Sequence, residues 1–166
     1  MTRVVISVGG SVLVPTLETH RLMEWADALK TLVKAGHQVF AVVGGGGEAR
    51  RYINVCRDIG LDEASADEFG ILITRINARL LIAALGEYAY PRVSESYLDA
   101  KEFALTGKVV VMGGVTPGQT TDAVAACLAE ETCASMMINM TTIDGIYSAD
   151  PKKDPAAVKY DTLGSQ

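Results

Sequence analysis

Apolar runs that stop at glycines alternate along the chain with segments whose apolar residues recur at helical spacing. The β-branched run over 3–8 ends at Gly9-Gly10-Ser11, and apolar residues then recur every three or four positions between Leu22 and Val33. The apolar run over 38–43 leads in the same way into four glycines, Gly44 to Gly47. This pattern predicts a strand, a glycine loop and a helix, twice in succession.

The alternation continues through the rest of the chain. The pattern predicts, in order, a helix over 48–58, a long helix over 67–85, a short strand over 88–93, a helix over 96–105, a strand over 108–112, a helix over 121–131 and a strand over 135–140. Strands that alternate with helices imply a largely parallel sheet with helices on both faces. We expect an α/β fold, a three-layer αβα sandwich with a mainly parallel sheet, in a single domain over 1–166.

Composition and charge narrow the class of protein. Hydrophobic residues make up 49% of the chain and charged residues 21%, and the apolar runs stay far short of a membrane span. The first residues contain no long apolar signal segment, so we expect a cytoplasmic address and no membrane partner. The formal net charge of −5 disfavours nucleic acid as a partner, because it repels polyanions. Any phosphate must therefore be held by local features.

The cysteines and histidines do not indicate a metal site. Cys56, Cys127 and Cys133 are odd in number and form no CxxC pair, which argues against a disulfide framework or a thiolate site. His20 and His37 fall on a predicted helix and at the entry to a predicted strand, without the partners that a zinc site or a catalytic triad needs. We therefore assign no metal ligand among the side chains.

Each of three predicted strands runs into a glycine loop: Gly9-Gly10, Gly44 to Gly47, and Gly113-Gly114. The carboxyl ends of parallel strands meet at one edge of a sheet, where ligands bind in open α/β folds. Successive glycine N–H groups can turn toward a phosphate, and the helix N-terminus that follows adds partial positive charge. One such loop is equally well explained as a tight turn, but three at one edge favour a shared phosphate site.

Two familiar nucleotide motifs fit less well. Gly44, Gly46 and Ala49 match the dinucleotide fingerprint G-x-G-x-x-A, with Asp67 at a tolerable distance for a ribose contact. That fingerprint normally follows the first strand, and it would leave Gly9-Gly10-Ser11 and the segment 113–122 unexplained. The P-loop pattern G-x-x-x-x-G-K-[ST] does not occur in the sequence.

Five spaced motifs, in order along the chain, resemble those of the amino acid kinase superfamily and, within it, the archaeal-type UMP kinases. They are Gly9-Gly10-Ser11-Val12-Leu13, Val42-Val43-Gly44-Gly45-Gly46 with Arg50, Met112-Gly113-Gly114, Thr120-Thr121-Asp122-Ala123, and Asp144-Gly145-Ile146-Tyr147-Ser148-Ala149-Asp150-Pro151. The resemblance extends from Met1 to Gln166. It implies an amino acid kinase-like fold and transfer of the γ-phosphoryl group of MgATP to UMP, giving UDP and ADP in pyrimidine nucleotide (CTP) biosynthesis.

The resemblance also implies roles for individual residues. Those expected to bind ATP are Gly9, Gly10, Ser11, Gly46, Arg50, Thr141, Tyr147 and Asp150. Those expected to bind UMP are Gly45, Asp67, Val115, Thr116, Pro117, Gly118, Gln119, Thr120 and Thr121. Gly10, Arg50 and Asp122 are the expected catalytic residues, Mg²⁺ would be held mainly by phosphates and water, and the family implies a homohexamer.

Two departures from the family pattern shape these expectations. Many superfamily kinases carry a lysine on the first strand where this chain has Ser7, so Arg50 and backbone donors must supply more of the positive field. Family members also continue beyond the position of Gln166, so we expect the C-terminal part of the fold to be absent and ATP to bind weakly. Another small-molecule kinase on this fold, such as isopentenyl phosphate kinase, and a non-catalytic nucleotide- or oxoanion-binding storage protein remain alternatives.

Overall fold

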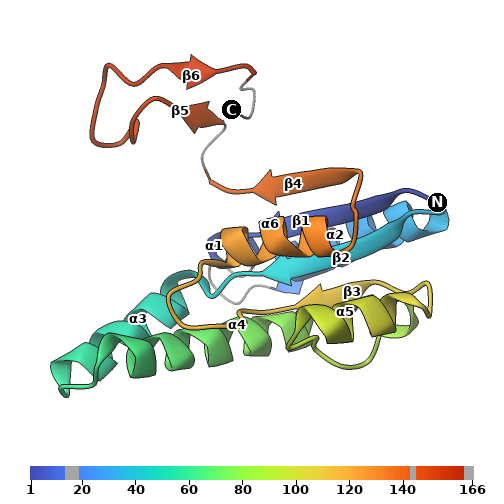
Figure 1. Ribbon diagram of the computed structural model, residues 1–166, viewed down its shortest axis with the longest axis horizontal. Helices are drawn as coiled ribbons and strands as arrows, with labels where there is room; N and C mark the ends of the chain where they lie inside the picture. The colour runs from blue at the N-terminus through green and yellow to red at the C-terminus, as the bar shows by residue number, and fades with distance from the viewer. Residues whose placement is uncertain (14–18, 143–144, 163–166) are drawn as a thin grey trace.

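The computed structural model describes residues 1–13, 19–142 and 145–162, and Figure 1 shows a sheet flanked by helices with a small hairpin beyond it. The elements follow in this order: β1 (Arg3–Val8), α1 (Gly10–Leu13), α2 (Thr19–Lys34), β2 (Gln38–Val43), α3 (Gly46–Asp58), α4 (Glu63–Leu85), the 3-10 turn η1 (Gly86–Tyr88), α5 (Tyr97–Ala104), β3 (Val110–Met112), α6 (Thr121–Glu131), β4 (Met136–Met140), β5 (Ile146–Tyr147) and β6 (Lys159–Tyr160).

The main sheet has four parallel strands in the order β3-β2-β1-β4. Strand β2 is buried along its whole length and β1 is buried from Val4 onward. Strands buried on both faces carry apolar residues without alternation, which is the pattern seen in the sequence. The predicted parallel α/β fold is confirmed.

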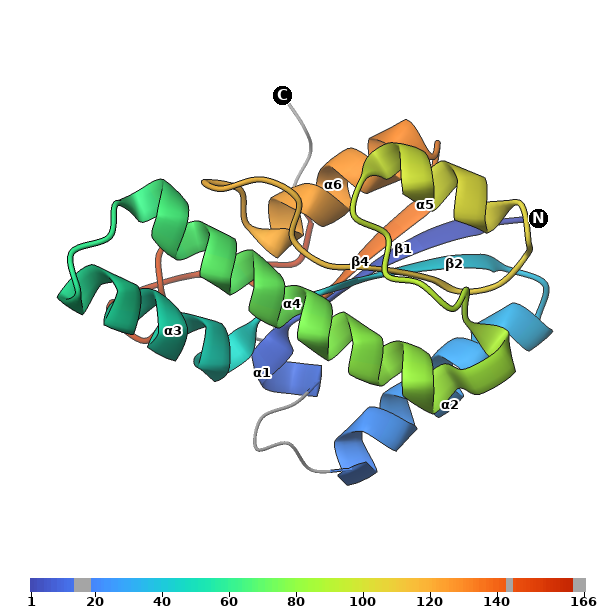
Figure 2. The same ribbon diagram turned by 90° about the horizontal axis from the view of Figure 1, so that it is seen from below.

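Helices cover both faces of this sheet, and alternate residues of each strand pack against the helices on opposite faces. Ile6 and Ala41 face a core cluster that includes Leu29 of α2 and Leu81 of α4. The neighbouring residues Val5, Phe40 and Val42 face the second cluster, to which Phe103 of α5 and Leu128 of α6 belong. Figure 2 shows the strands passing between α2 and α4 on one side and α5 and α6 on the other. The sheet is therefore the middle layer of a three-layer αβα sandwich, as predicted.

Helix α4 begins four residues earlier than the sequence pattern predicted, at Glu63. The reason is local: Asp62 has extended backbone angles, and its carboxylate accepts a hydrogen bond from the backbone N–H of Ser65, which makes it an N-cap. With η1, the helix is long and apolar enough in composition to span a membrane, with a mean hydropathy of 1.5 over its most apolar window. Its Ala78, Leu81 and Leu85 pack in the core cluster, however, so it serves here as a helix of the sandwich.

The short strand predicted over 88–93 is wrong. The chain there forms η1 and then makes only isolated bridges, Ala89 to Val109 and Ser94 to Met112. Pro91 lies between these bridges, and a proline has no N–H to give to a ladder. The segment therefore follows the edge of β3 without becoming a strand.

The chain after β4 leaves the sandwich. Strands β5 and β6 pair with each other in an antiparallel hairpin and not with the four-stranded sheet. In Figure 1 this hairpin lies beyond β4, set apart from the helices. Within β4, Met136, Met137 and Met140 are exposed although the strand pairs with β1 along its length.

Candidate functional site

Two adjoining hollows lie at the carboxyl edge of the sheet, where the loops that follow the four strands meet. The first, here called the glycine hollow, has a volume of about 520 Å³ and lies among the loops after β1, β2 and β4 and the start of α6. The second, the helix hollow, has a volume of about 310 Å³ and lies between α3, α4 and the loop 114–121. Ala49, Thr120 and Thr121 line both. A molecule in one hollow would therefore be the neighbour of a molecule in the other.

Most of the residues predicted for the site line one of these hollows. The glycine hollow is lined by Gly9, Gly10, Ser11, Gly45, Gly46, Arg50, Thr120, Thr121, Asp122 and Thr141. The helix hollow is lined by Asp67, Thr116, Gly118, Gln119, Thr120 and Thr121. Six of the eight residues expected to hold the phosphate donor thus lie together in the first hollow, and six of the nine expected to hold the acceptor lie in the second.

Four predicted residues are placed elsewhere. Val115 packs against the core cluster of α5 and α6, and Pro117, in the same loop, is not among the described residues that line either hollow. Tyr147 lies in β5, and Asp150 follows it in a turn where its Oδ1 accepts a hydrogen bond from the N–H of Lys152. Neither is among the described residues that line either hollow.

The glycine loops after β1 and β2 touch backbone to backbone. A Cβ atom added to Gly10 would lie 2.2 Å from the nitrogen of Gly46 and 2.5 Å from the carbonyl oxygen of Gly44. Gly46 has a φ of 66°, a left-handed conformation that side chains other than hydrogen rarely adopt. These two positions require glycine because the loops approach more closely than any side chain allows.

Two helices direct their N-termini at the glycine hollow. Helix α3 begins at Gly46 with no side-chain cap, so the N–H groups of its first turn have no partner within the helix. Helix α6 begins at Thr121, and its Thr120 cap uses the N–H of Ala123. Unpaired N–H groups and the partial positive charge of a helix N-terminus favour an anion here.

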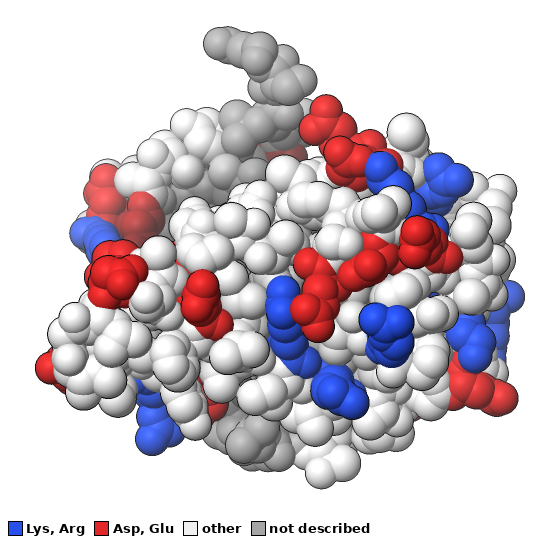
Figure 3. Space-filling model, turned by 60° about the horizontal axis from the view of Figure 1, so that its bottom comes forward, with Lys and Arg blue, Asp and Glu red and all other residues white. Residues whose placement is uncertain are grey.

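Arg50 brings a formal positive charge to this hollow. It lies in the first part of α3, is exposed, and donates from Nη2 to the hydroxyl oxygen of Ser11 at 3.2 Å. The contact ties α3 to α1, the short helix that follows β1, and holds the guanidinium at the rim of the hollow. On the face shown in Figure 3, acidic and basic side chains are interspersed, so this face carries no broad basic surface.

Ser7 and Asp122 form a polar pair under the loops. The Ser7 hydroxyl, 1% exposed in β1, donates to Oδ1 of Asp122 at 2.7 Å. Asp122 lies in the first turn of α6, where a carboxylate is favoured by the helix dipole. The pair fixes the direction of this carboxylate beside the glycine hollow.

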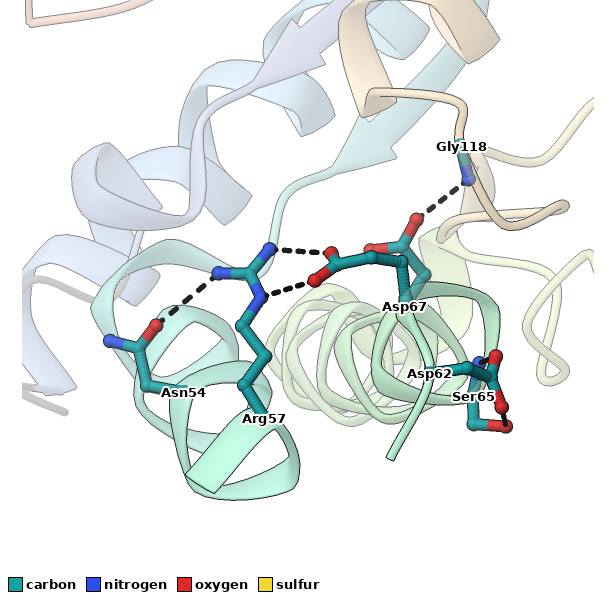
Figure 4. Close-up of polar contacts among 7 residues, drawn as sticks. Asn54, Arg57, Asp62, Ser65, Asp67 and Gly118 are labelled. Carbon is teal, nitrogen blue, oxygen red and sulfur yellow. Dashed lines mark hydrogen bonds and ion pairs between the residues drawn. The ribbon is translucent and has the colours of Figure 1, made fainter. Parts of the chain in front are cut away.

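Asp67 of α4 closes one side of the helix hollow. Its Oδ2 accepts a hydrogen bond of 2.7 Å from the backbone N–H of Gly118, as Figure 4 shows. Gly118 has a φ of 79°, so the loop turns sharply at this point. The bond ties the loop 114–121 to the helix and leaves the carboxylate a second oxygen for a ligand.

Sequence reasoning missed the polar residues on the buried face of α4. Thr74 and Asn77 are 6% and 7% exposed, and both contact the glycine loops. The available signal was a pair of polar residues three positions apart in a strongly apolar helix, a spacing that puts both on one face. Within the described part of the chain, no group of three or more His, Cys, Asp or Glu residues lies close enough together to hold a metal ion.

Comparison with known proteins adds independent evidence. The model of the amino acid kinase family matches residues 2–165. The uridylate kinase of Methanocorpusculum labreanum is 75% identical over 166 residues, which are 100% of this chain and 71% of that protein. The uridylate kinase of Methanoculleus marisnigri is 59% identical over 163 residues, 98% of this chain and 69% of that protein.

Solved structures show the same likeness. The crystal structure of uridylate kinase from Archaeoglobus fulgidus superposes with a TM-score of 0.89 at 48% sequence identity, covering 98% of this chain and 74% of that one. The UMP kinase of Bacillus anthracis superposes with a TM-score of 0.79 at 27% identity, covering 96% of this chain and 72% of that one.

Proposed function

Since this chain belongs to the amino acid kinase family, we propose that it is a UMP kinase, a phosphotransferase that moves the γ-phosphoryl group of ATP to UMP and yields ADP and UDP. One observation carries the proposal: the two hollows adjoin at Thr120 and Thr121, so that two phosphorylated molecules can meet end to end. The sequence identity to uridylate kinases, over 98% or more of this chain, indicates that the acceptor is UMP.

The two hollows differ in the ligand that each suits. The glycine hollow offers backbone N–H groups, Arg50 and the start of α3, which suit the triphosphate of ATP. The helix hollow offers the Asp67 carboxylate, which can accept hydrogen bonds from ribose hydroxyls, and the hydroxyls of Thr120 and Thr121, which can donate to the UMP phosphate. UMP in the helix hollow then presents its phosphate to the shared boundary.

The reaction needs no nucleophilic side chain. An oxygen of the UMP phosphate attacks the γ-phosphorus of ATP in line, a new P–O bond forms, and the bond to the β,γ-bridging oxygen breaks, so that ADP leaves. The protein brings the two anions together and stabilises the charge that shifts during transfer. Arg50 is the side chain placed to do so, since its planar guanidinium can contact several phosphate oxygens at once.

ATP enters as its magnesium complex. The cation would neutralise part of the charge on the β- and γ-phosphates, and the glycine hollow fits this, because Asp122 places a carboxylate among its lining residues. Ser7, which donates to Asp122, fixes the direction of that carboxylate. A homohexamer, a cytoplasmic address and a role in CTP synthesis stay predictions from the sequence.

A comparison of acceptors tests the proposal. ATP consumption is measured with UMP, CMP, AMP and isopentenyl phosphate at equal concentrations, and we expect UMP to give the highest kcat/KM. A preference for isopentenyl phosphate would contradict the proposal. Binding of ATP without turnover of any acceptor would indicate the storage alternative instead.

A further inference from the structure

Two buried polar side chains on α4 have no part in the mechanism described so far. Thr74 and Asn77 are three residues apart, so they lie on one face of the helix, and that face is turned toward the loops after β2 and β3. Most other buried residues of α4 are apolar or glycine. Burying a hydroxyl and an amide is unfavourable unless each finds a partner, so the partners of these two groups show what they do.

Asn77 binds the backbone of the second glycine loop. Its Nδ2 donates to the carbonyl oxygens of Gly44 at 3.0 Å and Gly45 at 3.4 Å. In a planar trans peptide the carbonyl of one residue and the N–H of the next point in opposite directions. With both carbonyls turned toward Asn77, the N–H groups of Gly45 and Gly46 point away from it.

The side away from Asn77 is the side of the glycine hollow. Gly45 and Gly46 line that hollow, and its described lining includes no residue of α4. The carboxamide of Asn77 thus aims two consecutive N–H groups at the place where the phosphates of ATP would lie. Gly46 also starts α3, so these donors add to the positive end of that helix.

Thr74 binds the third glycine loop in a similar way. Its Oγ1 accepts a hydrogen bond of 2.7 Å from the N–H of Gly114 and donates one of 2.6 Å to the carbonyl of Ile71. A Cβ atom on Gly113 would lie 2.7 Å from the same oxygen, so the loop lies directly against the helix. Thr74 and Gly114 both line the helix hollow, which places this contact at the start of the acceptor loop.

We infer that Asn77 and Thr74 are positioning residues that hold the two glycine loops at a fixed spacing across α4. Asn77 sets the direction of the amides that face the transferred phosphate, and Thr74 sets the position of the loop that holds the acceptor. The inference rests on the proposed function, because it assigns the two hollows to ATP and UMP. A positioning role is more than a purely structural one, in which the two side chains would only form hydrogen bonds with buried backbone groups.

Substitutions of matched size separate the two roles. Asn77→Asp keeps the shape of the side chain but places an acceptor against two carbonyls. We expect kcat to fall about tenfold or more, because the N–H groups of Gly45 and Gly46 would no longer point at the developing charge.

Thr74→Val removes the acceptor of Gly114 N–H, and we expect KM for UMP to rise about tenfold, the equivalent of one lost hydrogen bond. Thr74→Ser keeps the hydroxyl and should restore KM; Ala83→Ser, on the exposed face of α4, is the control.

A spectroscopic measurement on the full chain does not depend on turnover. In ¹H–¹⁵N spectra we expect the amides of Gly45 and Gly46 to shift when MgATP is added to the wild type, and to shift much less in Asn77→Asp and in Asn77→Ser, whose donor is too short to reach. Thermal unfolding identifies any variant that does not fold, and if one Asn77 variant does not fold, the other Asn77 variant decides. Folded variants with wild-type kcat, KM and amide shifts would overturn the inference. A wild type that binds MgATP but does not phosphorylate UMP would overturn the proposed function alone.

Discussion

At the scale of single residues, the site depends on backbone contacts that tolerate only a hydrogen atom. Gly10 shows this most clearly, since its missing side chain lets the loops after β1 and β2 meet. Gly47 is the natural contrast: it follows Gly46 in α3, and a Cβ atom there would meet nothing within 4 Å. Substitution of Gly10 should therefore have a larger effect than substitution of Gly47, although both lie in glycine runs of the sequence.

We predict that Gly10→Ala abolishes most phosphoryl transfer and lowers stability. The added Cβ would fall on backbone atoms of Gly44 and Gly46, which can yield only by moving the loop, at a cost on the order of 1–3 kcal/mol. Gly47→Ala should leave the rate nearly unchanged and raise the stability of α3 slightly, because alanine favours a helix. Initial rates and thermal melts of both variants give the comparison; equal rates would show that the loop contact is not needed.

Arg50 gives the second prediction at this scale. Arg50→Ala should lower kcat by roughly 10² or more, as expected for the loss of one preorganised donor at a developing charge. Arg50→Lys should rescue little, because an ammonium group cannot replace a planar guanidinium. Arg51→Ala is the matched control, since Arg51 lies next to it, is exposed and pairs with Glu48. If Arg50→Ala turns over like the wild type, Arg50 serves only to tie α3 to Ser11.

At the scale of elements, helix α4 connects the features of the site. Asp67 holds the loop 114–121, Thr74 holds Gly114, and Asn77 holds the second glycine loop. The helix is anchored at its start by the Asp62 cap and, beside it, by Arg57 of α3, which makes an ion pair of 2.7 Å with Glu63. A well-ordered start of α4 therefore helps to fix the position of Asp67, which lies one helical turn later.

The Asp62 cap makes the stability of this tip depend on pH. Hydrogen bonds from the backbone N–H and hydroxyl of Ser65 hold the pKa of Asp62 below its ordinary value. A carboxylate whose pKa is lowered in the folded state stabilises it at pH values above its unfolded pKa of about 3.9, and this contribution is lost as the pH falls through the folded pKa. Asp62→Ala should lower the melting temperature at pH 7, and the difference from the wild type should shrink below about pH 4.

Asn is the control for this cap, because it caps a helix about as well as Asp but does not titrate. Asp62→Asn should therefore melt close to the wild type at pH 7 and should not lose the contribution of the cap on acidification. A difference between the wild type and Asp62→Ala that stays constant from pH 7 to pH 3 would contradict the role assigned to the Asp62 charge.

At the scale of the whole molecule, most of the architecture could be predicted from the sequence. Apolar runs without alternation indicated a parallel sheet covered on both faces, and three glycine loops after strands indicated one shared edge; both are present. The start of α4 was missed because a capping aspartate acts through local geometry that apolar periodicity does not record. The strand over 88–93 was wrong because Pro91 cannot donate to a ladder.

The residues that line the candidate site could be predicted where they belong to a sequence motif, and not where their contacts depend on packing. Glycine loops, Arg50, Asp67 and the Thr-Thr-Asp segment could be read from their spacing and their resemblance to a family. The contacts of Ser7 with Asp122 and of Asn77 with the glycine carbonyls join residues 115 and 33 positions apart, and no local pattern indicates them. For Tyr147 and Asp150, a role at the ATP nucleoside stays a prediction from the sequence.

In the proposed reaction, a phosphoryl group passes directly from a molecule in the glycine hollow to one in the helix hollow. A ³¹P spectrum recorded over time with MgATP and UMP tests this directly, because ATP, UMP, the nucleoside diphosphates and inorganic phosphate give separate signals. We expect UDP and ADP to appear together in equal amounts, with no inorganic phosphate. Formation of ADP and inorganic phosphate without UDP, or no change in the presence of bound ATP and UMP, would contradict the account.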